Sequence, residues 1–136
     1  MAVQCLTNEY LSINAVVLST WVKSATLTID VATLDATAMG DSWTDNIGGL
    51  KSGTLSVTFN DDLAAGGPDV TLWALAIAGA PVAFEVRLDA GTVSATNPKY
   101  TGSVLINQFM IGGNVGDLAA KTFSFPTSSV VTRATS

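Results

Sequence analysis

The chain has 136 residues, enough for one domain with a sizeable core. Apolar residues make up 48% of it and charged residues only 12%, about half the usual charged share of a soluble domain. With a net charge of −5 and six scattered cations, a basic surface that grips nucleic-acid phosphates is excluded. So few charges favour a subunit that buries surface against copies of itself, with a compact β domain whose surface is rich in Ser and Thr as the alternative.

The residues needed for common catalytic and metal sites are missing. Because the chain lacks histidine, His-based triads and zinc sites are excluded, and its single cysteine, Cys5, cannot form an internal disulfide. We expect Cys5 to be a small buried apolar residue. The acidic pairs Asp61–Asp62 and Asp41–Asp45 are interpreted as solvated turns. We therefore expect no enzyme activity, no cofactor and no metal.

The sequence also gives expectations about location. No basic segment precedes an apolar run at the N-terminus, so no signal peptide is expected. The most apolar window, 70–84, is too short to cross a bilayer and is interrupted by Gly79 and Pro81. We expect synthesis in the cytoplasm and no membrane partner.

Alternation of apolar and polar residues predicts a mainly β fold of seven or eight short strands. Residues 1–8 are of uncertain order, 16–23 form a turn or single helical turn, and the polar segment 127–136 is expected to be a flexible tail. The predicted architecture is a single domain, 1–136, a β-sandwich or partly rolled barrel with one flanking helix. The predicted strands are 10–14, 24–34, 54–59, 82–88, 100–107, 109–111 and 121–126.

One helix is predicted, at about 69–78. Pro68 suits the first helical position, Asp69 complements the helix N-terminus, and Gly79 is placed to end the helix. Because it is almost wholly apolar, we expect it to lie against a sheet or inside a subunit interface. The face expected to be buried comprises Val70, Trp73, Ala74 and Ile77, with Trp73 more often a core residue than a contact.

The segment Asp35–Asp62 organises the rest of the chain. It is predicted to be the end of one strand, a long polar excursion rich in glycine, and a return strand in which Leu55, Val57 and Phe59 alternate with polar residues. We expect a hairpin arm at about 33–59 that touches another molecule. Trp43 is expected either to anchor this arm on a neighbour or to fold back onto its own sheet.

The same segment resembles the tail tube (major tail) proteins of long-tailed, siphovirus-type bacteriophages. In that family a strand ending D-x-T-A-M/F-G-D is followed by an aromatic residue, I-x-G-L-K and F-N-D/Q-D. The corresponding residues here are Asp35, Thr37–Asp41, Trp43, Ile47–Lys51 and Phe59–Asp62; further matches are Leu72–Trp73, Val86–Arg87, Ser94–Pro98, Tyr100–Gly102 and Gly116–Leu118. The ordered set covers most of the chain, although the chain is short for the family.

The resemblance implies the phage tail tube fold and a structural virion protein that forms rings of six copies stacked into a hollow tube. Its lumen would pass genomic DNA without specific binding, and its partners would be the tape measure protein, the tail terminator and distal tail or baseplate proteins. Lumen and inter-subunit contacts would come from Asp35, Thr37, Met39, Asp41, Trp43, Asp45, Ile47, Leu50 and Lys51. Ring stacking would involve loops around Asp62, Pro68, Asp89 and Asn97.

Other assignments stay open. The chain could be a capsid decoration protein or the tube subunit of a contractile tail or injection device. A sugar-binding sandwich is a third class, but it would need several exposed aromatic residues on one platform, and only Trp43 is a candidate. Self-assembly separates these classes, because only a tube subunit is expected to form hexamers or filaments.

Overall fold

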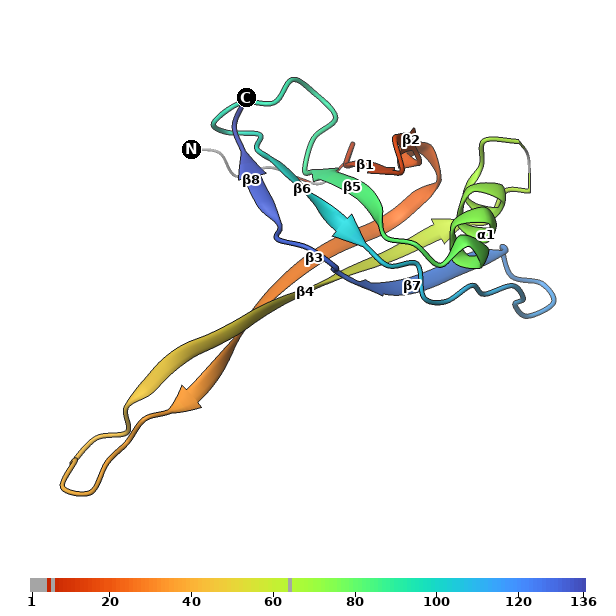
Figure 1. Cartoon of the computed structure of the whole chain (residues 1–136). Helices are drawn as coiled ribbons and strands as arrows, with labels where there is room; N and C mark the ends of the chain where they lie inside the picture. Colours follow the sequence, from red (N-terminus) through yellow and green to blue (C-terminus); the bar gives the residue numbers. More distant parts are fainter. Residues whose placement is uncertain (1–4, 6, 64) are drawn as a thin grey trace.

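The computed structural model describes residues 5, 7–63 and 65–136. These residues form eight strands, one short 3₁₀ helix and one α-helix, with a long hairpin that extends away from a compact body (Figure 1). In chain order the elements are β1 Tyr10–Ile13, β2 Val16–Val17, η1 Ser19–Trp21, β3 Val22–Asp35, β4 Asn46–Asn60, α1 Pro68–Ala78, β5 Val82–Arg87, β6 Lys99–Val104, β7 Ala120–Pro126 and β8 Thr132–Ala134.

The strands form two antiparallel sheets. The first has the order β2-β1-β5-β6-β8 and the second the order β3-β4-β7. They are joined at one corner, where Val104 bridges to Thr127 and the Leu105 amide donates to the Pro126 carbonyl at 3.0 Å. The mainly β prediction, with two sheets partly rolled together and one helix beside them, is confirmed.

The core lies between the sheets and under the helix. Alternate residues of the strands point inward because successive side chains of a strand face opposite sides. Full burial of one such side chain stabilises the fold by about 1.5–3 kcal/mol. The buried apolar residues are Leu11, Ile13, Leu18, Leu55, Val57, Phe59, Leu72, Phe84, Val86, Val104, Ile106, Phe123 and Phe125.

The helix begins and ends where the sequence predicts. Pro68 occupies the first turn, Asp69 follows it, and Gly79 ends the helix in the left-handed conformation at φ 68° with its amide bonded to the Leu75 carbonyl. The inward face was predicted wrongly, because Leu72 is the residue that is buried, with Leu75 and Ala76 packed beside it. Nearly every residue of α1 is apolar, so the sequence pattern could not distinguish the two faces.

The hairpin contains more strand than expected. Residues 46–53, which were assigned to a polar excursion, belong to β4 and pair with β3 out to the Asp35–Asn46 pair. Only residues 36–45 form the connection between the two strands. Of the four glycines in the segment Asp35–Asp62, only Gly40 has a positive φ, at 99°. The other three glycines adopt ordinary strand geometry, which this residue type also permits.

Four smaller expectations are corrected. The segment 127–136 is not wholly a frayed tail, because β8 pairs with β6 through Thr132–Ala134 and Val131 packs on the core. Residues 109–111 form no strand, although Phe109 packs against the core. Cys5 is exposed rather than buried. Val16–Val17 form a short strand before the helical turn Ser19–Trp21; of the uncertain segment 1–8, residues 1–4 and 6 lie outside the described residues.

Candidate assembly interface

The tip of the hairpin, residues 36–45, is fastened by its own polar groups. The Asp35 carboxylate accepts from the Thr37 amide at 2.9 Å, and the Asp41 carboxylate accepts from the Ala38 amide at 2.8 Å. The Thr37 hydroxyl accepts from the Asp45 amide at 2.8 Å. Short polar side chains that bond to nearby backbone groups are typical of ordered turns. The tip therefore has a defined shape although it projects away from the body.

The fastening changes the acidity of Asp35. Hydrogen bonds from the Thr37 side chain and then from the Thr37 backbone amide lower its pKa below the usual 3.8. Hydrogen bonds to an ionised carboxylate favour the charged form. Asp35, Asp41 and Asp45 are the only charged residues between positions 33 and 50, so the tip carries negative charge alone.

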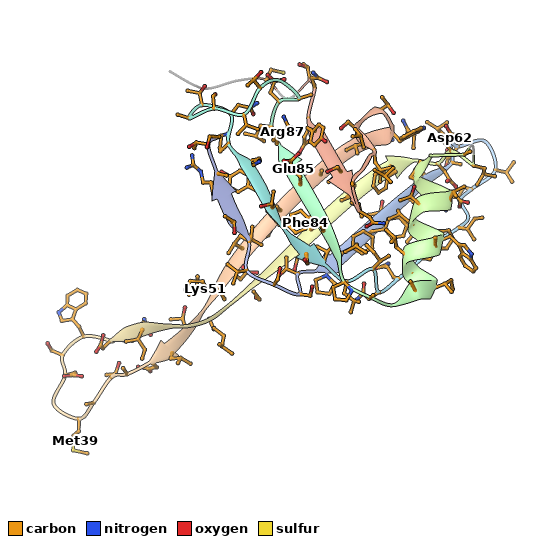
Figure 2. The ribbon with its side chains drawn as sticks, turned by 45° about the horizontal axis from the view of Figure 1, so that its top comes forward. Met39, Lys51, Asp62, Phe84, Glu85 and Arg87 are labelled. Atoms are coloured by element: carbon orange, nitrogen blue, oxygen red, sulfur yellow. The ribbon has the colours of Figure 1, made fainter. Side chains whose placement is uncertain are left out.

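The arm exposes large apolar side chains. Met39 and Trp43 at the tip are 104% and 86% exposed, and Leu50 is 88% exposed. Trp43 therefore does not fold back onto its own sheet, and this rules out one of the two alternatives stated for this residue. Figure 2 shows Met39 at the far end of the arm and Lys51 closer to the body. Exposed apolar residues gathered on one projecting element indicate a surface that another molecule covers.

The apolar residues change from one face of the arm to the other near a β-bulge in β4. The register of the β3–β4 pair shifts between Val31 and Thr33. Ile29 and Val31 continue the core-facing side, whereas Leu34 and Ile47 form the next apolar pair on the opposite side. An extra residue in one strand reverses its alternation relative to the partner, as bulges do. The arm therefore has one apolar face near the body and the opposite one near its tip.

The strand edges of the arm are also unpaired. β7 pairs with β4 over Thr54–Asn60, the Gly53 carbonyl accepts from the Thr127 amide at 3.0 Å, and β3 is the outermost strand of its sheet. Within the described chain both edges of the arm are therefore open along residues 46–52 and their partners. Unpaired backbone amides and carbonyls form a template for pairing with another strand. Both the side chains and the backbone of the arm thus lack a partner in the single subunit.

A second exposed apolar surface lies at the other end of the body, on α1. Val70, Trp73 and Ile77 are 47%, 54% and 68% exposed. Trp73 rests its edge on Phe109, with 5.2 Å between ring centroids, so it is partly a packing residue and partly open surface. The helix was expected to lie against a sheet or inside a subunit interface. It packs on its own subunit through Leu72, and its other face is available for an interface.

The loops predicted to stack between rings differ in how open they are. Asp62 accepts from the indole nitrogen of Trp21 at 2.8 Å, and Pro68 is buried within its own subunit. Asp89 is exposed. The Asn97 amide group donates to the carbonyls of Asp89, Gly91 and Thr92 at 3.0, 3.3 and 3.2 Å, which closes that loop upon itself.

A buried cation beside α1 was not predicted. Lys121 is 1% exposed, and its Nζ lies 2.5 Å from Asp69 and 3.6 Å from Asp61. It also lies 4.0 Å from the centre of the Phe109 ring. Asp61 and Asp69 are therefore structural partners, and Asp61–Asp62 is not the solvated turn that was expected. The signal was available: Lys121 shares the inward parity of Phe123 and Phe125, and a buried cation requires a nearby carboxylate.

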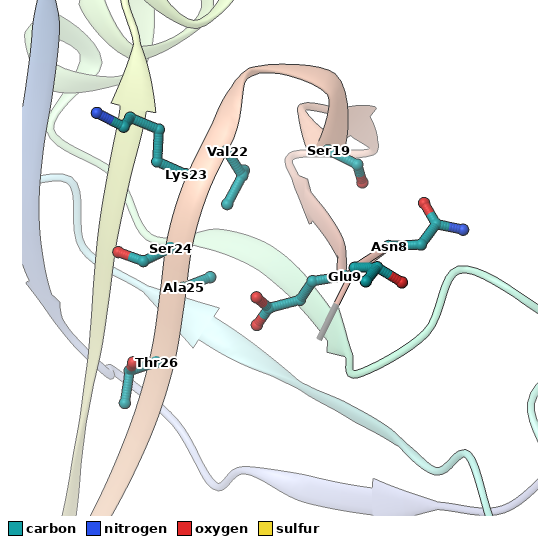
Figure 3. Close-up of a pocket in the computed structure, with 9 residues that line it drawn as sticks. Asn8, Glu9, Ser19, Val22, Lys23, Ser24, Ala25 and Thr26 are labelled. Carbon is teal, nitrogen blue, oxygen red and sulfur yellow. The ribbon is translucent and has the colours of Figure 1, made fainter. Parts of the chain in front are cut away.

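Two hollows lie beside β3. The first, of about 270 Å³, is lined by residues 7–9 on one side and by Val22–Thr26 of β3 on the other (Figure 3). Burial raises the pKa of Glu9 at this site above 4.5. The second, of about 580 Å³, lies at the root of the arm and is called the root groove here. It is lined by Ile29, Lys51, Ser52, Gly53, Tyr100, Thr127, Ser128, Ser129, Val130, Val131 and Arg133.

Comparison with known proteins identifies the fold. No family model matches the chain, and no curated protein matches it. A chain from the virion of a native gene transfer agent particle has a TM-score of 0.79 at 13% identity, covering 97% of this chain and 99% of that one. A chain from the tail of an empty gene transfer agent particle, solved with C6 symmetry, has a TM-score of 0.69 at 15% identity, covering 82% and 81%.

These likenesses extend over the body and the arm together, because the first covers nearly all of both chains. At such low identity they establish a shared fold. The fold is the mainly β tail-protein type that the sequence resemblance predicts. The described part of the chain contains one helix, α1, whose 11 residues fall well short of the roughly 20 that a membrane-crossing helix needs.

Proposed function

We propose that this chain is a structural subunit of a phage-like virion tail, where six copies form a ring and rings stack into a tube. The observation that carries the proposal is the arm: a preformed hairpin with open edges and exposed apolar side chains on a fold shared with a chain of a C6-symmetric tail. The body supplies the core for folding, and the arm supplies the surface for assembly.

In a ring, the open edges of each arm would pair with those of its neighbours. Six hairpins placed side by side would form a closed barrel, and closing a sheet removes its unpaired edges. The apolar residues on the outward face of each arm would then be covered by the bodies of the ring. Such a contact is head-to-tail rather than self-complementary, which is the kind of contact that generates rings.

The charge of the arm suits a channel for DNA. The arm, residues 33–59, carries three carboxylates and one cation, Lys51, so a lumen built from arms would have net negative charge, repel phosphates and hold no duplex in place. The lumen would hold a tape measure protein before the genome passes. A tail terminator and distal tail or baseplate proteins would close the two ends of the tube. Loops around Asp89 and Asn97 would contact the next ring.

Electron microscopy of the purified protein over a concentration series tests this function. Rings with six-fold symmetry, or tubes with a regular axial repeat, are the expected result. Leu50→Ala should weaken assembly without lowering the melting temperature, because Leu50 is 88% exposed in the subunit. Leu118→Ala, at a 72% exposed residue outside the arm, is the matched control. Compact particles of one small size at every concentration would contradict the proposal and favour a decoration protein.

A further inference from the structure

The root groove combines two kinds of binding group. Ile29, Val130 and Val131 provide apolar walls, and Val130 is 84% exposed at the rim. Lys51 and Arg133 provide positive charge, and no carboxylate lines the groove. A hollow of about 580 Å³ with a mostly apolar lining and a few convergent polar groups has the size and character of a binding site.

Few cations of the described surface are free of an ion pair. Of the six cations, Lys121 is buried in its ion pairs and Arg87 is paired with Glu85 at 3.1 Å. Lys51 and Arg133 form no ion pair within the described residues; the only hydrogen bond that either side chain makes there is from the Arg133 guanidinium to the Tyr100 hydroxyl at 3.3 Å. The groove thus holds two of the four remaining cations of a chain whose net charge is −5.

The tip of the arm has the complementary composition. It presents two large exposed apolar side chains, Met39 and Trp43, beside the carboxylates of Asp41 and Asp45. The exposed face of α1 is a poorer match for the tip, because Lys121, the cation beside its first turn, is buried and already paired with Asp61 and Asp69. Complementary charge selects among apolar surfaces that are otherwise similar, since like charges placed together cost binding energy.

The tip cannot reach the groove of its own subunit. Asn46 lies five residue steps from Lys51 along β4, about 17 Å at the rise of an extended strand, and the tip lies beyond that (Figure 2). The β3–β4 ladder continues past the groove to Asp35, interrupted there only by the bulge between Val31 and Thr33, so the arm stays paired and has no open hinge at which it could fold back. An arm that fills this groove must therefore come from another copy.

We propose that the root groove receives the arm tip of a second copy of this chain. Trp43 or Met39 enters between Ile29 and Val130, and the carboxylates of Asp41 and Asp45 face Lys51 and Arg133. The contact joins two different surfaces of the subunit, so it repeats from copy to copy and extends an assembly. It rests on the proposed function, and it adds a definite pair of surfaces: the tip of one arm and the root of the next.

A charge exchange tests the pairing. Lys51→Glu and Asp45→Lys each place like charges at the contact, and each should raise the protein concentration needed for tubes at least ten-fold. Neither side chain makes a hydrogen bond or ion pair within the described subunit, so both variants should fold normally. The double variant, and an equal mixture of the two single variants, should both recover assembly. Lys23→Glu and Asp117→Lys make the same charge changes on exposed surfaces outside the groove and tip, and they should assemble like the parent protein.

Photo-crosslinking locates the contact directly. With p-benzoylphenylalanine in place of Trp43, irradiated protein should form crosslinks between subunits that map by mass spectrometry to residues 127–133. Crosslinks that map to another arm or to α1, in protein that still forms tubes, would overturn this inference and leave the proposed function intact. Crosslinks to 127–133 without any ring or tube would support the contact and contradict the tube. Failure of the double variant to recover assembly would also overturn the pairing.

Discussion

The ion cluster beneath α1 gives the sharpest prediction about stability. Lys121 is 1% exposed and depends on two carboxylates, with Asp69 at 2.5 Å and Asp61 at 3.6 Å. Asp69→Asn removes the closer charge and leaves a buried ammonium group. Breaking a buried ion pair from one side costs about 3–5 kcal/mol. Because Asp61 remains nearby, we expect a loss near the lower limit, about 3 kcal/mol in the free energy of unfolding.

A second substitution shows whether the loss comes from the stranded charge. Lys121→Met combined with Asp69→Asn removes the cation and keeps an apolar side chain of similar length against Phe109. Replacing a buried ion pair by apolar groups is often nearly neutral, so the double variant should be more stable than Asp69→Asn alone. We expect a coupling energy of about 2 kcal/mol, within the range seen for residues in direct contact.

Urea unfolding followed by tryptophan fluorescence measures these differences, at a concentration at which the chain is monomeric. For slopes of about 1–3 kcal/mol per molar urea, a 3 kcal/mol loss moves the midpoint by roughly 1–3 M. Asp117→Asn, in an exposed loop, is the matched control and should change stability by less than about 0.5 kcal/mol. A loss below about 1 kcal/mol for Asp69→Asn, or a double variant less stable than the single one, would refute this reasoning.

Further predictions concern the arm and the first hollow. Gly53→Ala should destabilise the subunit by about 1–3 kcal/mol in urea unfolding, because a Cβ at this position would lie 3.0 Å from the Thr127 side chain. Gly48→Ala is the control and should be nearly neutral, because the nearest atom to its added Cβ is 3.5 Å away. Burial raises the pKa of Glu9, so its ionisation opposes folding as the pH rises above 4.5; Glu9→Gln should raise the melting temperature at pH 7, with the difference disappearing below pH 4. In hydrogen exchange, amides of residues 46–52 that face the open edge should exchange quickly in the free subunit and slowly in assembled protein.

Local signals in the sequence predicted much of the fold. The start of α1 was predicted because Pro68 and Asp69 suit a first helical turn, and its end because Gly79 adopts the left-handed conformation. Strand β7 was predicted because Phe123 and Phe125 alternate with small polar residues. Each of these signals depends on the backbone preferences of neighbouring residues, so a single sequence contains them.

The missed features depend on residues far apart in the chain. Strand β8 has only three residues, and Lys99 pairs with Ala134 across 35 positions of sequence, so no local alternation marks it. The inward face of α1 is set by which residues its neighbours cover, which an all-apolar helix does not reveal. The bulge near Val31, which brings Ile47 of β4 to the same face as Leu34 of β3, likewise depends on the register between two strands.

The arm is already ordered in the free subunit, and this favours assembly. A two-stranded hairpin without further cover is only marginally stable in water. Here β3 and β4 continue from the three-stranded sheet, and Asp35, Thr37 and Asp41 fix the tip, so much of the conformational entropy is already lost in the free subunit. A surface ordered beforehand loses less freedom on association, which strengthens binding without any added contact. Substitutions that only loosen the tip should therefore slow assembly while leaving the core, and the melting temperature, unchanged.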